Sequence, residues 1–299
     1  MSRDDARSIP IDEALLRAWP LPMPDADDDK EARGRVCIVA GGRDVPGAAL
    51  LAGTSALRAG CGKLLLGTPA GIAASLGIAM PEARVVALPE TAGGAPGDGS
   101  AALLAPWAAK SQSMLIGPGL LDEPACQALV RALLPAWRDV PVVLDAAAMG
   151  VVAAAGPFDA PVLLTPHAGE MAHLCGAAKD TIAADTAAAA RAAARRWNAV
   201  VVLKGALTCV AAPSGTSWRH DGRGLVGLAT SGSGDVLAGL IAGLAARGAP
   251  LEQAAVWGVA LHARAGATLA RRMGTLGYLA RELADEVPAA MQALCAVAP

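Results

Sequence analysis

The chain has 299 residues, with 25 basic against 27 acidic side chains, and it is 54% hydrophobic but only 3% aromatic. This length predicts one large domain or two small ones, and the apolar fraction excludes general disorder. The near-neutral charge gives no electrostatic footprint for nucleic acid, and no segment reaches the roughly 18 uninterrupted apolar residues of a membrane span.

Residues 1–33 form an acidic N-terminal segment in which one short helix is expected at 11–19, ended by the prolines that follow. The chain opens polar and acidic, where a secretory leader needs a basic start and an apolar block. The six cysteines show no C-x-x-C spacing and sit mostly in apolar runs. We therefore expect reduced cysteines without a zinc or disulfide role, in a cytoplasmic protein.

Residues 34–299 are expected to form one α/β domain. Short β-branched runs alternate with longer Ala-rich stretches, and the runs are continuously hydrophobic, as strands buried on both faces are. Expected strands are 36–40, 64–67, 85–88, 114–117, 142–145, 162–165 and 200–204, and expected helices between them include 46–60, 123–137 and 180–197. This alternation predicts a mostly parallel sheet covered by helices on both faces.

An antiparallel hairpin at one edge of the sheet is expected from residues 208–212 and 216–219, because Pro213-Ser214-Gly215 lies between them. Three helices are expected after it, at 233–247, 251–273 and 279–294. The glycine-rich loop 93–100 is expected to be a solvated connection without chemistry.

The strongest chemical signal is the tetrapeptide Gly232-Ser233-Gly234-Asp235, which directly precedes an apolar helix. Glycines let the backbone approach a ligand closely, and the first turn of a helix leaves N–H groups without partners, which suits a phosphate. Asp235 has two interpretations: a helix cap worth about 1 kcal/mol, or a general base that deprotonates a substrate hydroxyl during phosphoryl transfer. Gly239 and Gly243, further along this helix, indicate close packing.

Four more clusters each follow a predicted strand. His167 and Glu170 form either a helix-capping arrangement or a pair in which His167 donates to a substrate and Glu170 orients magnesium or phosphate. Lys204 either contacts a phosphate, with Gly205 permitting close backbone approach, or extends from the sheet edge. Gly117-Pro118-Gly119 and Asp145 also have ordinary turn or cap interpretations. The coincidence of all five clusters at one rim, where open α/β sheets bind ligands, favours a site.

Other nucleotide-binding and metal-binding patterns fit poorly. Gly62-Lys63 is excluded as a P-loop because Leu57 and Leu64 occupy positions that need Gly and Ser or Thr, and the glycines after the first strand lack the Rossmann spacing. His173 and His262 fall in predicted helices as ordinary partly buried residues, and His220 in a turn. No transition-metal site is expected.

Taken in this order, the motifs resemble the ribokinase-like fold and, more closely, the ADP- or ATP-dependent NAD(P)H-hydrate dehydratase family, from residue 35 to the C-terminus. The segments that carry the resemblance are Gly47-Ala48-Ala49, Gly117-Pro118-Gly119, TPHAGE at 165–170, Lys204-Gly205, ATSGSGD at 229–235, Leu261-His262 and 283–288.

The resemblance implies a repair enzyme that dehydrates the S epimer of hydrated NADH or NADPH, with ADP or ATP as phosphoryl donor and Mg²⁺ bridging the phosphates. It implies that Asp235 is catalytic, and that the hydrated cofactor contacts Ala48, Gly117, Gly119, His167 and Asp235. The nucleotide would be held by Lys204, Gly205, Ala206, Leu207, Thr208, Gly232, Ser233 and Gly234. Asp145 and Glu170 would orient phosphate or Mg²⁺, and the assembly would be a homotetramer.

Three segments depart from the family pattern. Ala147 stands where a second carboxylate is usual, residues 224–227 (GLVG) replace an Asn-containing segment, and residues 30–34 replace a His-Lys-Gly. With about 34 residues ahead of the first strand, a fused epimerase domain is not expected, so an epimerase would be a separate chain. Two alternatives stay open: a small-molecule kinase of the same fold acting on a vitamin-precursor or sugar alcohol, and a catalytically weak nucleotide-binding sensor. The choices between ADP and ATP, and between the NADH and NADPH hydrates, also stay open.

Overall fold

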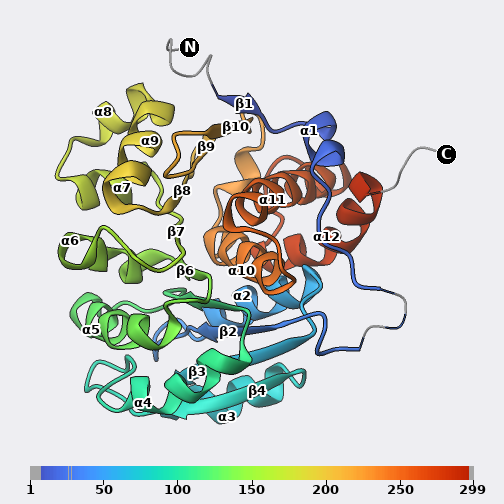
Figure 1. The fold of residues 1–299 in the computed structure, drawn as a ribbon. Helices are drawn as coiled ribbons and strands as arrows, with labels where there is room; N and C mark the ends of the chain where they lie inside the picture. Colours follow the sequence, from blue (N-terminus) through green and yellow to red (C-terminus); the bar gives the residue numbers. More distant parts are fainter. Residues whose placement is uncertain (1–7, 26, 28, 296–299) are drawn as a thin grey trace.

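A computed structural model describes residues 8–25, 27 and 29–295, and these form one sheet covered by helices on both faces (Figure 1). The sheet has the strand order β1-β10-β9-β8-β7-β6-β5-β2-β3-β4. Strands β2 to β8 pair in parallel with their neighbours, whereas β9 runs antiparallel to β8 and β10. The predicted α/β class and mostly parallel sheet are confirmed.

The strands are β1 (Ile9–Pro10), β2 (Arg35–Val39), β3 (Lys63–Pro69), β4 (Ala83–Leu88), β5 (Ser113–Ile116), β6 (Val142–Leu144), β7 (Val162–Leu164), β8 (Val200–Leu203), β9 (Leu207–Ala211) and β10 (Ser217–Asp221). The α-helices are α1 (Glu13–Ala18), α2 (Gly47–Arg58), α3 (Ala70–Ala79), α4 (Ser100–Leu104), α5 (Glu123–Leu133), α6 (Val152–Ala155), α7 (Ala168–Cys175), α8 (Lys179–Ala184), α9 (Thr186–Trp197), α10 (Ser233–Ala246), α11 (Leu251–Met273) and α12 (Ala280–Cys295).

Two hydrophobic cores lie on the two faces of the sheet, because successive strand side chains point to opposite faces. Ile38 and Val202 pack with α2, α10, α11 and α12 on one face, and Val39 and Leu203 pack with α5 and α9 on the other. Double-sided burial is the reason the strands are continuous hydrophobic runs.

The N-terminal segment extends the sheet. Strand β1, which the sequence did not predict, pairs in parallel with β10, so the β9–β10 hairpin is not at the edge as expected. The Trp19 carbonyl accepts hydrogen bonds from Gln253 and Trp257 of α11, and the Trp19 ring stacks on Trp218 at 5.8 Å. The described residues of the N-terminal segment therefore pack into the same hydrophobic core as the domain that begins at residue 34.

Three further expectations on secondary structure were wrong. The helix expected at 180–197 is broken into α8 and α9, because the Asp185 side chain accepts a hydrogen bond from the amide of Ala188 and caps a new helix. The helix expected at 123–137 ends at Leu133 and continues as a 3₁₀ turn that contains a proline. His220 lies in β10, not in a turn.

The six cysteines all lie in the described part of the chain and form no disulfide there, and four of them are buried. Burial raises the pKa of Cys61 and of Cys126 to about 12, so these thiols are not ionised near neutrality. None of the helices in the described part of the chain combines the length and apolar character that crossing a bilayer requires.

Candidate functional site

The ends of strands β5 to β8 bring four of the predicted clusters to one rim. Gly117 follows β5 and lies against Asp145, which follows β6: a Cβ atom on Gly117 would come within 1.8 Å of the Asp145 carbonyl oxygen. His167, beyond β7, forms a parallel bridge with Lys204, beyond β8. Gly117 is thus required by close backbone approach, because any side chain there would separate two neighbouring strand ends.

An ion-pair cluster occupies this rim. The Lys204 ammonium donates to Asp145 Oδ1 at 3.2 Å and lies 4.0 Å from Glu170 Oε2, and the Thr165 hydroxyl donates to the same Asp145 oxygen at 2.5 Å. Asp145 is buried, with 3% of its surface exposed. Burial alone lowers the pKa of Lys204, but the surrounding carboxylates outweigh it and raise that pKa overall, so the lysine is charged.

Asp235 completes the cluster from the other side of the rim. It lies in the first turn of α10, which begins after Gly232 in the left-handed conformation at φ +86° and has no side-chain cap. The capping interpretation of Asp235 is therefore wrong. Burial and the nearby Asp145 carboxylate raise the pKa of Asp235 to about 7, although Lys204 opposes the shift. A carboxyl with this pKa suits a general base at neutral pH.

A cavity of about 640 Å³ opens beside this cluster. Lys204 lines it, whereas Asp145, Gly232 and Asp235 are not among its lining residues. Its floor is the turn between β8 and β9, and its walls come from the start of α10, from α11 and from the segment that contains residues 224–227. The lining includes His167, Lys204, Gly205, Ala206, Thr208, Gly224, Leu225, Val226, Ser233 and Gly234. A Cβ atom on Gly234 would lie 3.3 Å from Lys204 Nζ, so this glycine keeps space open at the lysine.

His167 caps helix α7, as one of its two interpretations predicted. Its Nδ1 accepts hydrogen bonds from the amides of Gly169 and Glu170, and the Glu170 carboxylate accepts from the His167 amide at 2.7 Å. Because Nδ1 is an acceptor, the neutral ring carries its proton on Nε2. The ring also lines both the main cavity and an adjacent one of about 420 Å³ that contains Ala147. Capping therefore leaves His167 a donor for a ligand.

The remaining predicted residues fall into two groups. Ala48 and Gly119 lie together, since a Cβ atom on Gly119 would come within 2.7 Å of Ala48 Cβ, but Ala48 is only 2% exposed and lies outside both cavities. Leu207 does not join its neighbours in the main cavity and faces the opposite side of the sheet.

His262 is a site residue that the sequence reasoning treated as ordinary. From α11 it reaches the start of α10, where its Nε2 lies 3.0 Å from Ser233 Oγ, and it lines the main cavity. Burial lowers its pKa to about 4, so it is neutral near pH 7. The Leu261-His262 pair was the available signal, but its contact with Ser233, 29 residues away, depends on the packing of two helices.

Comparison with known proteins gives one consistent family. The family model for NAD(P)H-hydrate dehydratases matches residues 36–289. The chain is 49% identical to an ADP-dependent (S)-NAD(P)H-hydrate dehydratase of Xanthomonas campestris, over 94% of this chain and 95% of that protein. It spans about half the length, 53%, of bifunctional NAD(P)H-hydrate repair enzymes that it also matches.

Solved structures agree in fold. The ADP/ATP-dependent NAD(P)H-hydrate dehydratase from Bacillus subtilis, co-crystallized with ATP/Mg²⁺, matches with a TM-score of 0.80 and 32% identity over 96% of this chain and 99% of that chain. A ribokinase-like superfamily protein from Enterococcus faecalis matches with a TM-score of 0.82 and 24% identity over 98% of each chain, a likeness that concerns the fold alone. The expected ribokinase-like fold is confirmed.

Proposed function

The chain belongs to the NAD(P)H-hydrate dehydratase family, and from that premise we propose that it is a nicotinamide-cofactor repair enzyme. It would convert (6S)-NADHX or NADPHX to NADH or NADPH, using ADP or ATP and releasing AMP or ADP with phosphate. The observation that carries the proposal is the state of Asp235. Its carboxyl does not cap the helix, has a pKa of about 7 and lies beside the Lys204–Asp145 pair.

The 640 Å³ cavity is the place proposed for the nucleotide. The N–H groups at the start of α10 have no side-chain cap, and the positive end of the helix dipole favours a phosphate there. Lys204 adds a charged ammonium next to the open space at Gly234. The turn from Gly205 to Thr208, closed by its own hydrogen bonds, would hold the AMP part.

In the first step, the Asp235 carboxylate takes the proton from the ring hydroxyl of the substrate. The resulting oxygen bonds to the terminal phosphorus as the bond from that phosphorus to the departing nucleotide breaks, so that AMP leaves when ADP is the donor. The amides of the first turn of α10 stabilise the charge on the transferred phosphoryl oxygens. With a pKa of about 7, Asp235 is ionised in about half of the molecules at neutral pH.

In the second step, phosphate departs with the electron pair of its bond to the ring carbon, assisted by the lone pair of the ring nitrogen. The neighbouring ring carbon then loses a proton, which restores the double bond and the dihydronicotinamide. Phosphorylation is needed because hydroxide is a poor leaving group. The proton on His167 Nε2 would hydrogen-bond the substrate, as its exposed position permits.

Magnesium fits this site as a partner of phosphates, not as a protein-held ion. The described residues contain no cluster of three or more potential His, Cys, Asp or Glu ligands, and Mg²⁺ is commonly bound by one or two carboxylates plus substrate phosphates. Asp145 and Glu170 would each offer one remaining oxygen, because Asp145 Oδ1 accepts from Thr165 and Lys204 and Glu170 Oε2 accepts from the His167 amide. When bound, the ion would neutralise charge on the phosphates.

A recovery assay tests this function. The purified protein, hydrated NADH or NADPH, Mg²⁺ and either ADP or ATP should restore the absorbance of the reduced nicotinamide. Asp235→Asn should lose this activity, while the matched control Asp285→Asn, an exposed carboxylate paired with Arg58, should keep it. No recovery with either nucleotide rejects the proposal, and a stable phosphorylated alcohol from a substrate panel would favour the kinase alternative.

The cellular setting is part of the same proposal. We propose a cytoplasmic homotetramer that acts after a separate epimerase. Six cysteines that form no disulfide among the described residues support the reducing compartment, and the assembly rests on the family resemblance. Light scattering of the purified protein tests the tetramer.

A further inference from the structure

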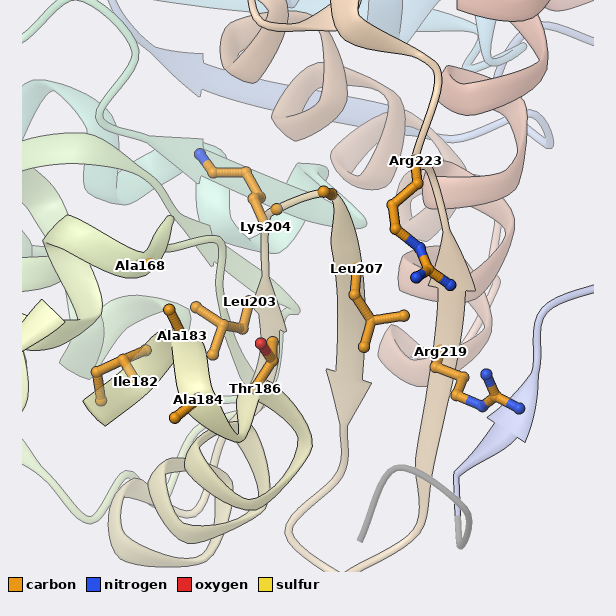
Figure 2. A pocket seen from close by; sticks show the side chains of 12 residues that line it. Ala168, Ile182, Ala183, Ala184, Thr186, Leu203, Lys204, Leu207, Arg219 and Arg223 are labelled. Atoms are coloured by element: carbon orange, nitrogen blue, oxygen red, sulfur yellow. The ribbon is translucent and has the colours of Figure 1, made fainter. Parts of the chain in front are cut away.

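A second cavity, of about 390 Å³, lies on the opposite face of strands β8 to β10 from the proposed nucleotide site. Figure 2 shows the residues of α8 and Leu203 on one side of it, Arg219 and Arg223 on the other, and Leu207 between them. Its volume is within the range of about 300–1,000 Å³ typical of small-molecule sites. Of its lining residues, only the segment 204–207 takes part in the function proposed above.

The sheet itself separates the two cavities. Successive strand residues point to opposite faces, and this is seen twice: on β9, Thr208 lines the nucleotide cavity and Leu207 the second one; on β10, His220 lines the nucleotide cavity and Arg219 the second one. Lining residues common to both are confined to the 204–206 turn and Arg223, at one end of the hairpin. The second cavity is therefore a distinct site.

The polar chemistry of this cavity is cationic. Arg219 lines the cavity and is partly exposed; its Nε atom is buried without a hydrogen-bond partner among the described residues, so only the outer part of its guanidinium can meet a ligand. Arg223 stands at the rim, where its Nε donates to Asp221 Oδ1 at 2.8 Å. Of the described side chains that line the cavity, none is a carboxylate. An anionic ligand would therefore meet the positive charge of Lys204, Arg219 and Arg223 with no lining carboxylate to oppose it.

The rest of the lining is apolar. Ile182 and Leu203 belong to the buried core on this face, and Ala183 and Leu207 extend the same surface toward the opening. Such walls exclude water from an apolar body and strengthen a charged hydrogen bond at its end. The cavity therefore suits a molecule with an anionic head and an apolar body.

We propose that this cavity binds a small amphipathic anion, a carboxylate or phosphate carried on an apolar or aromatic frame. Arg219 donates to the anionic head, since the guanidinium forks match carboxylate and phosphate oxygens. The apolar side chains of α8, β8 and β9 cover the frame. Arg219 lines only this cavity and none of the space proposed for the nucleotide, so anion binding at Arg219 should leave the repair reaction unchanged.

The test uses the full-length protein and the fluorescent sulfonate anilinonaphthalene sulfonate, with enough AMP present to fill the nucleotide cavity. Arg219→Gln should weaken binding of this probe at least tenfold. Ala183→Trp, at an exposed position on the cavity wall, should weaken it similarly by filling the space. Arg195→Gln on α9 removes the same charge from an exposed residue outside the lining, and it should leave binding unchanged.

Displacement then identifies the head group. Benzoate displacing the probe supports a carboxylate, and phenyl phosphate displacing it supports a phosphate; displacement by neither overturns the proposal. The proposal is also overturned if Arg219→Gln and Ala183→Trp both bind the probe with wild-type affinity. It is overturned as well if AMP alone abolishes binding of the probe. Thermal unfolding of each variant confirms that it is folded, and Arg219→Gln should retain full repair activity, which separates this proposal from the proposed function.

Discussion

Helix α10 uses glycine for opposite purposes in its first turn and in its middle. At the start, Gly232 adopts φ +86° and Gly234 leaves space beside Lys204. In the middle, Gly239 and Gly243 remove space: a Cβ atom on them would come within 2.2 Å of the Ala52 carbonyl oxygen and 2.5 Å of that of Ala56, both on α2. One end of the helix leaves open space, and the remainder is packed closely against a neighbouring backbone.

The two regions also differ in how favourable their own interactions are. The middle of α10 is entirely buried and apolar, and it contributes to the core. The first turn instead holds a carboxyl whose burial beside Asp145 raises its pKa, which is unfavourable for the ionised form. Stability and function should therefore separate along one helix: changes in the first turn should reduce activity, and changes in the middle should reduce stability.

The largest effect is expected from Asp235→Asn. A general base contributes about 10²–10⁴-fold in rate, so kcat should fall by about that factor. The variant should unfold at a temperature no lower than wild type, because the substitution removes a carboxyl that is unfavourable where it stands. Steady-state kinetics and calorimetry measure the two. A variant with wild-type kcat would show that Asp235 is not the base.

Lys204→Met should have the next largest effect, and it should reduce both activity and stability. Removing one partner of a buried ion pair costs about 3–5 kcal/mol, and less is expected here because the Lys204 side chain is 19% exposed. Loss of the ammonium also removes the charge that lowers the pKa of Asp235, so the acid limb of kcat/KM should move to higher pH. An unchanged free energy of unfolding together with an unchanged pH profile would contradict the electrostatic coupling of Lys204 to Asp145 and Asp235.

Gly239→Ala should destabilise the fold by about 1–3 kcal/mol through overpacking. The added methyl group meets backbone of α2, which cannot rotate away as a side chain can. Residual activity of the folded fraction should be near that of wild type. Chemical unfolding measures the loss, and Gly248→Ala, where a Cβ atom meets nothing within 4 Å but φ is +94°, separates crowding from backbone strain.

The fold was largely predictable because its strands are buried on both faces and are recognisable as continuous apolar runs. Strand β1 was missed since two residues, Ile9 and Pro10, carry no periodic signal and pair only through a partner more than 200 residues away. The break at Asp185 was missed because Ala-rich sequence continues on both sides of it, and only the side-chain hydrogen bond to Ala188 shows that a new helix begins.

The candidate site was predictable as far as strand ends could be read from sequence. The clusters at Gly117, Asp145, His167 and Lys204 meet because parallel strands end at one edge. What the sequence could not give was which groups pair: the Lys204–Asp145 contact spans 59 residues, and the raised pKa of Asp235 depends on that pair. The amphipathic cavity at Arg219 likewise depends on α8 packing over the hairpin.

A smaller effect concerns stability as a function of pH. The folded-state pKa of Asp235, about 7, lies above its ordinary value of 3.8, so the folded chain binds the proton more tightly than the unfolded chain between these values. Wild type should therefore lose stability relative to Asp235→Asn as pH rises from about 4 to about 7, by on the order of 1 kcal/mol after solvent screening. A difference that stays constant through this window would contradict the raised pKa.

The smallest effect is expected from His262, which positions Ser233 through its bond to the hydroxyl. His262→Leu removes one hydrogen bond worth about 0.5–1.5 kcal/mol, so KM for the nucleotide should rise by roughly two- to tenfold while kcat stays near wild type. Because the His262 pKa is lowered to about 4, any change in the wild-type KM across the ordinary histidine range should persist in His262→Leu, since it comes from other groups such as Asp235. His262→Gln can return an amide to the Nε2 position, and its partial recovery of KM would distinguish positioning from simple packing; a fall in kcat at constant KM would place His262 in the chemical step instead.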